Sequence, residues 1–154
     1  MSTTTNSKII KSTPEKIYRA LTEPQALEVW LAPGEMKGKI HKFDLREGGS
    51  YEMSLYYPSS EKAAPGKTNA HEDRFKARFV KLVPNQKIEQ IILFDSSDPS
   101  FSGEMIMEVT LEKVNDGTQV TFVFKNIPAG IKPEDNEKGT EESLEKLAKY
   151  LSVS

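Results

Sequence analysis

The chain has 154 residues, 36% hydrophobic and 29% charged, which fits one domain, residues 1–154, with a buried core. Its 21 basic and 23 acidic residues form no basic stripe and it holds no cysteine, which argues against a nucleic-acid surface and excludes disulfides, thiolate catalysis and cysteine metal sites. The longest aliphatic and aromatic run, residues 91–94, is far too short to span a membrane, and the polar N-terminus is unlike a signal peptide, so we expect no membrane insertion and a cytoplasmic location.

The first predicted elements are short. Residues 8–11 predict a brief strand, and residues 12–15 have the features of a helix start: a hydroxyl cap, a proline in the first turn and an early acid. Glu23 and Pro24 end this helix, and a second short helix carrying Trp30 ends before Gly34.

From Glu35 the hydrophobic period changes to two, which is typical of half-buried strands. Asn115, Asp116 and Gly117 form a hairpin turn signal, and residues 58–70 predict a long loop. The expected strands are residues 40–45, 51–57, 72–83, 87–95, 104–114 and 118–125.

The last predicted element is a helix over residues 133–151, with acids near its start and lysines near its end, as the helix dipole prefers. Its expected inner face is Thr140, Ser143, Leu144, Leu147, Ala148 and Leu151. Short turns between consecutive strands imply antiparallel pairing. We therefore predict an α+β fold, with two short N-terminal helices and a curved antiparallel sheet around a long C-terminal helix.

Several stretches carry a family resemblance: STPEKI (12–17), ALTEP (20–24), FDLREGGSY (43–51), PAGIKPEDN (128–136) and LEKL (144–147), together with Leu27, Trp30 and Gly139. The sequence resembles the START-like, or birch-pollen-allergen-like, superfamily (SRPBCC), in the AHSA-type branch named after the activator of the heat-shock chaperone ATPase. The resemblance implies a helix-grip fold around a cavity for lipids, sterols, polyketides or other apolar compounds; some members are enzymes.

Two departures from that branch matter. Thr140 follows Gly139, where many relatives carry a tryptophan. True chaperone activators have a further domain and an N-terminal segment that stimulates ATP hydrolysis, whereas residues 1–7 are the only extension here. The branch name is therefore not taken as the function.

A cavity is expected beneath the N-terminal half of the final helix, where small side chains leave space that the leucines fill further along. Methionines and aromatic residues would make its walls adaptable. The residues expected to line it are Trp30, Tyr51, Met53, Phe75, Met105, Met107, Phe122, Phe124, Gly139, Thr140 and Ser143. The alternative is an ordinary core, with Trp30 or a tyrosine filling the gap.

Other polar patterns have structural interpretations. Asp44, Arg46, Gly48 and Gly49 predict a supported turn rather than an anion site. The glutamates at 104, 108 and 112 predict a solvated ladder facing the cations at 74, 76 and 78, rather than a carboxylate pair for catalysis.

Histidines occur only at His41 and His71, far apart in the sequence, so we expect no metal site and no cofactor. We assign no catalytic residue, because the inward-facing positions contain almost no ionisable group. Tyr51, Tyr57 and Arg46 are the exceptions considered.

The resulting functional hypothesis is a module that binds a small hydrophobic or amphipathic molecule without chemistry. One alternative is a co-chaperone-like interaction domain, with a chaperone or a second copy as partner. Another is a cyclase, dehydratase or hydrolase acting on a bound apolar substrate, which would need an ionisable group inside the cavity.

Overall fold

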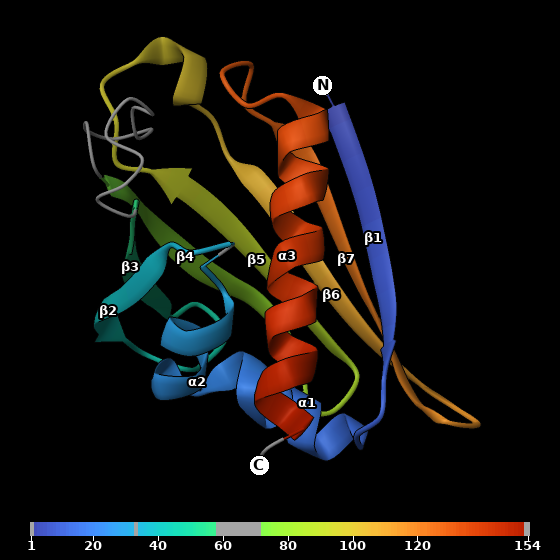
Figure 1. Ribbon diagram of the computed structural model, residues 1–154. Coiled ribbons are helices and arrows are strands. Elements are labelled where there is room, and N and C mark those ends of the chain that lie inside the picture. Colours follow the sequence, from blue (N-terminus) through green and yellow to red (C-terminus); the bar gives the residue numbers. More distant parts are fainter. Residues whose placement is uncertain (1, 33, 58–71, 153–154) are drawn as a thin grey trace.

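The computed structural model describes residues 2–32, 34–57 and 72–152. Within these ranges the chain forms one antiparallel sheet with strand order β1-β7-β6-β5-β4-β3-β2 (Figure 1). The elements in chain order are β1 (Ser2–Ile10), α1 (Pro14–Thr22), α2 (Pro24–Trp30), β2 (Lys37–Phe43), β3 (Ser50–Tyr56), β4 (Glu72–Val83), β5 (Lys87–Phe94), the 3₁₀ turn η2 (Pro99–Phe101), β6 (Met105–Val114), β7 (Gly117–Ile127) and α3 (Pro133–Ser152).

The long helix α3 crosses the inner face of the curved sheet, and α1 and α2 close the end of the sheet near the helix C-terminus (Figure 1). Thr13 caps α1 by accepting a hydrogen bond from the backbone N–H of Lys16, as its sequence predicts. The predicted α+β fold, an antiparallel sheet around a C-terminal helix, is confirmed. No helix in the described part of the chain is long and apolar enough to cross a membrane.

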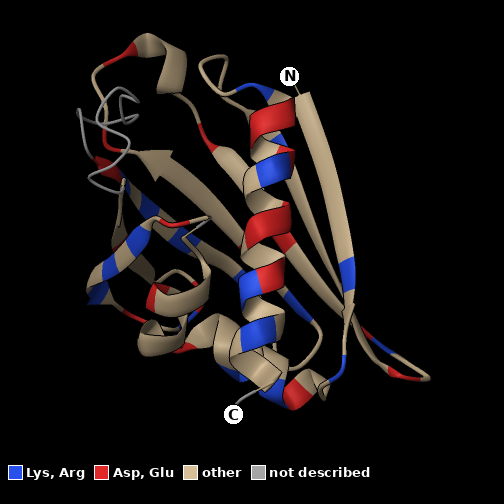
Figure 2. Cartoon of the chain, in the orientation of Figure 1, with Lys and Arg blue, Asp and Glu red and all other residues tan. Residues whose placement is uncertain are grey.

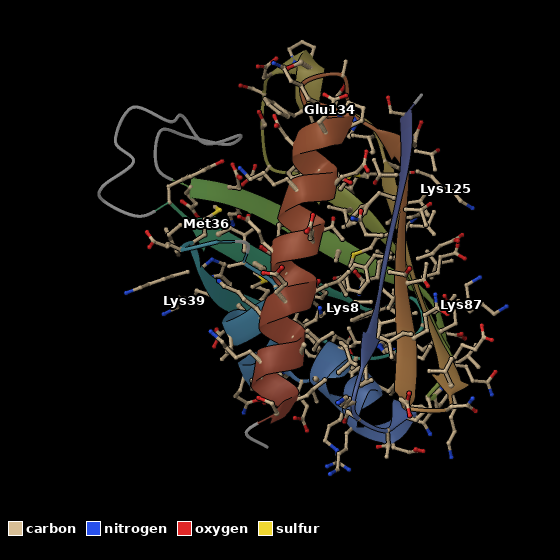
Figure 3. The ribbon with its side chains drawn as sticks, turned by 45° about the vertical axis from the view of Figure 1, so that its right-hand side comes forward. Lys8, Met36, Lys39, Lys87, Lys125 and Glu134 are labelled. Carbon is tan, nitrogen blue, oxygen red and sulfur yellow. The ribbon has the colours of Figure 1, made fainter. Side chains whose placement is uncertain are left out.

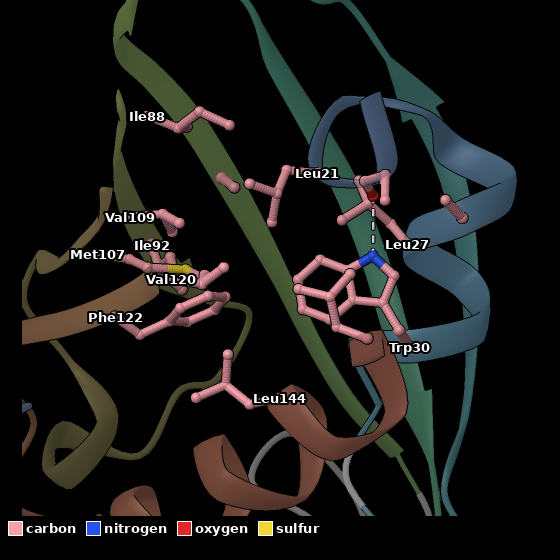
Figure 4. Close-up of a cluster of buried hydrophobic side chains, with 14 of the residues drawn as sticks. Leu21, Leu27, Trp30, Ile88, Ile92, Met107, Val109, Val120, Phe122 and Leu144 are labelled. Atoms are coloured by element: carbon pink, nitrogen blue, oxygen red, sulfur yellow. Dashed lines mark hydrogen bonds between the residues drawn. The ribbon is translucent and has the colours of Figure 1, made fainter. Parts of the chain in front are cut away.

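The hydrophobic core lies between the sheet, α1, α2 and the C-terminal half of α3 (Figure 4). At its centre the Trp30 indole is fully buried, and its Nε1–H donates to the carbonyl oxygen of Ala20 at 2.8 Å. The indole also meets the ring of Phe122 edge to face, with centroids 6.0 Å apart. Trp30 thereby joins both short helices to β7 of the sheet.

Side chains along α3 match the predicted inner face. Leu144, Leu147 and Leu151 are buried together with the smaller Thr140 and Ser143. The Ser143 hydroxyl donates to the carbonyl oxygen of Leu31 at 2.8 Å, which ties the middle of α3 to the end of α2. Acids and lysines follow one another along the outward face of the helix (Figure 2).

Two strands, β1 and β2, start more than one residue away from their predicted starts. β1 starts at Ser2 rather than residue 8, because its threonine-rich start pairs with β7 and the Thr4 hydroxyl donates to Oδ1 of Asn136 on α3 at 2.5 Å. β2 spans Lys37–Phe43 rather than 40–45, since its register with β3 begins at Lys37. The predicted loop at 58–70 and His71 lie outside the described residues.

The predicted glutamate ladder is only partly correct. Arg78 of β4 does pair with Glu104, with Nη2 and Oε2 4.0 Å apart, but β5 lies between β4 and β6, so Glu108 does not pair with the cations of β4. Glu108 instead pairs with Lys125 of β7 at 3.1 Å, and Arg74 of β4 pairs with Glu52 of β3 at 3.2 Å. Lys125 lies on the outer surface of the sheet (Figure 3).

Candidate functional site

A cavity of about 550 Å³ lies between the inner face of the sheet and the N-terminal half of α3. This is the half of the helix that starts near Glu134 (Figure 3). Asn136, Gly139, Thr140 and Ser143 line it from the helix, whereas the three buried leucines further along α3 pack in the core. The volume falls within the range of about 300–1,000 Å³ that is usual for small-molecule sites.

Most of the residues predicted to line a cavity lie around this space. They come from four strands and the helix, and are Tyr51, Phe75, Met105, Met107, Phe122, Phe124, Gly139, Thr140 and Ser143. Alternation along the strands places their side chains on the inner face of the sheet, as the register of β3 to β7 shows.

Trp30 and Met53, which the sequence predicts at the cavity, are not among the described residues that line it. Trp30 is drawn toward α1 by its hydrogen bond and lies in the core against Phe122. Met53 packs against β2, where its Cε lies 2.5 Å from the place a Cβ would take at Gly38. Both residues belong to the core.

Some lining residues could not be recognised from strand periodicity. Phe101 comes from η2, and Ile131 and Lys132 come from the connection before α3. Irregular segments carry no period from which an inward direction can be read. The two connections are joined, since the N–H of Gly130 donates to the carbonyl oxygen of Ser100 at 2.7 Å.

Asp73 is a carboxylate on the inner wall of the cavity, with only 2% of its surface exposed. The Tyr57 hydroxyl donates to its Oδ2 at 2.9 Å, and Tyr57 lines the cavity too. The expectation that the interior holds almost no ionisable group missed this residue. The signal was in the sequence, because Asp73 has the same parity as Phe75, Ala77 and Phe79 on β4.

Tyr51 brings a second polar group to the cavity wall. Burial raises the pKa of its phenol well above the usual value, and the neighbouring Gln90 side chain offsets this only in part. The phenol therefore stays protonated at neutral pH and can donate a hydrogen bond. Gln90 is itself buried, and its Oε1 has no hydrogen-bond partner within the described residues.

Charged residues also line the cavity where α3 begins: Asp98 before η2, Lys132 before the helix and Asp135 in its first turn. The backbone N–H and the hydroxyl of Ser100 donate to Asp98 Oδ1 at 3.0 and 2.8 Å. These hydrogen bonds lower the pKa of the Asp98 carboxyl, so it is ionised at neutral pH.

Other sequence candidates do not contribute to the cavity. Arg46 is exposed and its Nε donates to Asp44 Oδ2 at 2.8 Å. The N–H of Gly49 donates to the carbonyl oxygen of Arg46 at 2.9 Å, and a Cβ at Gly49 would lie 2.4 Å from the carbonyl oxygen of Asp44. This geometry matches the predicted turn.

The histidine and carboxylate side chains of the described ranges were also considered as metal ligands. His41 Nε2 lies 2.8 Å from Ser54 Oγ. Within residues 2–32, 34–57 and 72–152, no group of three or more His, Cys, Asp or Glu side chains is arranged to hold a metal ion.

A curved antiparallel sheet that holds one long helix over an apolar cavity has the helix-grip architecture of START-like domains. Residues 11–152 match the family described as "Activator of Hsp90 ATPase homolog 1-like protein", and the chain therefore belongs to that family. This agrees with the resemblance drawn from the sequence. No curated protein matches the chain.

Solved structures support the same assignment. A protein of Chromobacterium violaceum is 30% identical, with a TM-score of 0.85 over 96% of this chain and 95% of its own. A Mesorhizobium loti protein is 19% identical, with a TM-score of 0.73 and coverage of 99% and 98%. The AHSA1-like protein of Aeromonas hydrophila is 14% identical, with a TM-score of 0.73 and coverage of 99% and 93%. The latter two likenesses show the fold alone.

Proposed function

We propose that this domain binds a small apolar or amphipathic molecule in the cavity beneath the N-terminal half of α3. The observation that supports this proposal is the cavity itself. Its volume is about 550 Å³, and its walls are largely methionine, phenylalanine, isoleucine and leucine side chains. Burying apolar surface there contributes about 25 cal/mol per Å² removed from water, so a hydrocarbon chain has a clear driving force to enter. Membership of a family whose fold binds hydrophobic ligands supports the same function.

A second candidate function is acid–base chemistry on the bound molecule, as in a cyclase, dehydratase or hydrolase. One observation favours it: the Asp73 carboxylate and the Tyr57 hydroxyl form a hydrogen-bonded pair in the cavity wall. A carboxylate in such a wall can take a proton from a substrate held within hydrogen-bond reach.

A chaperone-binding surface has less support. The large apolar side chains that are exposed lie on five different segments of the described chain: Ile9, Val29, Leu45, Tyr56 and Val80. A docking surface for a chaperone would be expected to gather such residues into one patch.

Native mass spectrometry of protein purified from its own host tests binding directly. We expect added mass that disappears after unfolding, solvent extraction and refolding, and saturable binding of the neutral fluorophore N-phenylnaphthylamine by the stripped protein. Bare protein that also fails to bind the fluorophore would overturn the proposal. Recovery of the extracted molecule unchanged after incubation with fresh protein would favour binding, whereas its conversion would favour the second candidate.

A further inference from the structure

We propose that the cavity binds amphiphiles whose polar group is a hydroxyl, and that this hydroxyl lies at the inner wall between Tyr51 and Gln90. There it accepts a hydrogen bond from the phenol and donates one to the amide oxygen. This inference rests on the proposed binding function and names the class of ligand. Long-chain alcohols are the simplest members of that class.

Gln90 is a polar side chain that the alternation of β5 places among apolar ones. It shares the inner face of the sheet with Ile88 and Ile92. Only 4% of its surface is exposed, and its Oε1 has no hydrogen-bond partner within the described residues. A buried carbonyl oxygen without a donor is unfavourable, so a ligand that brings a donor to it gains affinity.

The cavity extends to the residues around Gln90. Ile92, two residues along the same face of β5, lines the cavity, and so does Met107, which stands opposite Gln90 on β6. Ile88, two residues in the other direction, packs in the core and is not among the described lining residues. Gln90 therefore stands where the cavity meets the core.

Tyr51 brings its phenol to the same place. It stands on β3 opposite Ala77 of β4, and β5 is the next strand of the sheet. Because Ala77 is small, the phenol can extend over β4 toward Gln90, whose side chain forms a hydrogen bond with it. The ring is held by Phe43 and Phe79, with centroids 5.5 and 5.7 Å from its own.

Together the two side chains present one donor and one acceptor. Burial raises the pKa of the Tyr51 phenol and the hydrogen bond from Gln90 offsets this only in part, so the phenol is protonated at neutral pH. Its oxygen accepts from the Gln90 amide, which leaves its O–H to donate to a ligand in the cavity that Tyr51 lines. A hydroxyl group accepts and donates, so it can bond to the phenol O–H and the amide oxygen at once.

The apolar part of such a ligand has a separate place. Met105, Phe122 and Phe124 line the cavity on β6 and β7, below the N-terminal half of α3. A chain whose hydroxyl lies between Tyr51 and Gln90 would extend over these residues, toward the end of the cavity where α3 begins. The polar group would thus be the most deeply placed part of the ligand.

Competition against N-phenylnaphthylamine compares decanol with its isomer methyl nonyl ether, which contains the same atoms but cannot donate a hydrogen bond. A purely apolar cavity would favour the ether, because burying a hydroxyl without a partner is unfavourable. We expect the wild-type protein to bind decanol at least about five-fold more tightly than the ether.

Gln90→Met keeps the length of the side chain and removes the amide. We expect it to weaken decanol binding until the two affinities differ by less than about two-fold, while the affinity for the ether changes little. Gln86→Met is the matched control, because it makes the same substitution at an exposed glutamine between β4 and β5, and it should leave the ratio of the two affinities unchanged.

Tyr51→Phe tests the donor, since it removes the hydroxyl and keeps the ring. Both compounds accept a hydrogen bond from Tyr51, so we expect both to bind about three- to ten-fold more weakly, with decanol still preferred. Tyr56→Phe, at an exposed position of the same strand, should change neither affinity.

The outcomes separate the two proposals. Equal or tighter binding of the ether by the wild-type protein, or an unchanged ratio in Gln90→Met, overturns the hydroxyl assignment while the binding function stands; a buried water that satisfies Gln90 would give this result. Failure of both compounds and of the fluorophore to bind the wild-type protein overturns the binding function itself.

If Gln90→Met does not fold by circular dichroism, nuclear Overhauser contacts in the wild-type protein saturated with decanol decide. Contacts between the C1 protons of decanol and the side-chain amide protons of Gln90 support the assignment. Their absence from the saturated complex overturns it.

Discussion

Thr140 occupies the point on α3 where the helix passes from cavity to core. Its side chain lines the cavity and its hydroxyl donates to the carbonyl oxygen of Asn136, one turn back, at 2.8 Å. We expect Thr140→Trp to place the indole in the cavity, to change the free energy of unfolding by less than about 1 kcal/mol, and to weaken N-phenylnaphthylamine binding at least about ten-fold. Urea unfolding and a fluorophore titration measure the two effects.

Glu141→Trp is the matched control, because residue 141 follows directly and lies on the exposed side of the helix. Glu141→Trp should leave the free energy of unfolding and the affinity for N-phenylnaphthylamine unchanged. A destabilisation of about 1–3 kcal/mol by Thr140→Trp, which is the usual effect of overpacking, combined with unchanged fluorophore binding, would show that the space beneath Thr140 is not the ligand site.

Individual residues also show how far sequence patterns reach. Alternation identified Phe75, Met105 and Phe124 as inward-facing, and α-helical spacing identified Thr140 and Ser143. A period gives the face of an element but not the depth beneath it, so it could not separate Trp30 in the core from Phe122 at the cavity. Asp73 was missed because it was not among the inward-facing ionisable residues considered, although it has the same parity as Phe75 on β4.

The β6–β7 hairpin is the element most dependent on a single glycine. Gly117 has a φ of 149°, and a Cβ there would lie 2.2 Å from the carbonyl oxygen of Ile10 at the end of β1. We expect Gly117→Ala to lower the free energy of unfolding by at least about 3 kcal/mol, because a strained backbone and a steric clash with β1 act together. Urea unfolding measures this loss.

Gly48→Ala provides the comparison, since Gly48 also has a positive φ, 86°, but no atom lies within 4 Å of the position that a Cβ would take there. Gly48→Ala should lower the free energy of unfolding by only about 1–2 kcal/mol, because the added Cβ makes the positive φ unfavourable but meets no neighbouring atom. Equal losses at the two positions would show that Ile10 and β1 move aside easily, and that the contact with the hairpin is not tight.

At the level of elements, the helices and most strands could be predicted from the sequence, but the residues at which some of them begin could not. The boundaries of β4 and the start of α1 at Pro14 agree with the prediction, since strong alternation and a capping threonine mark them. The start of β1 could not be predicted, because its pairing with β7 is made by the backbone and leaves no hydrophobic period in Ser2–Ile10. The positions of η2 and the connection before α3 depend on the Ser100–Gly130 hydrogen bond between distant segments.

The whole molecule is arranged so that its two ends differ. At one end α1, α2 and the leucines of α3 fill the space over the sheet, and at the other end the smaller helix residues leave the cavity. The antiparallel pairing of consecutive strands was predictable from the short turns, the long helix from the change of hydrophobic period, and the family from short motifs. The place of β1 beside β7 was not predicted. The volume and polarity of the cavity were not, because they depend on how side chains from many elements meet.

Methyl chemical-shift mapping with decanol tests the central claim, binding in this cavity, most directly. The account predicts saturable shifts at the methyl groups of Ile92, Ile131, Met105 and Met107, which line the cavity. Ile88 on the same strand as Ile92 and Leu147 on α3 lie in the core outside it and should stay nearly constant. Saturable shifts confined to surface methyl groups such as those of Ile9 and Val29, or constant cavity methyl groups at excess decanol, would contradict it.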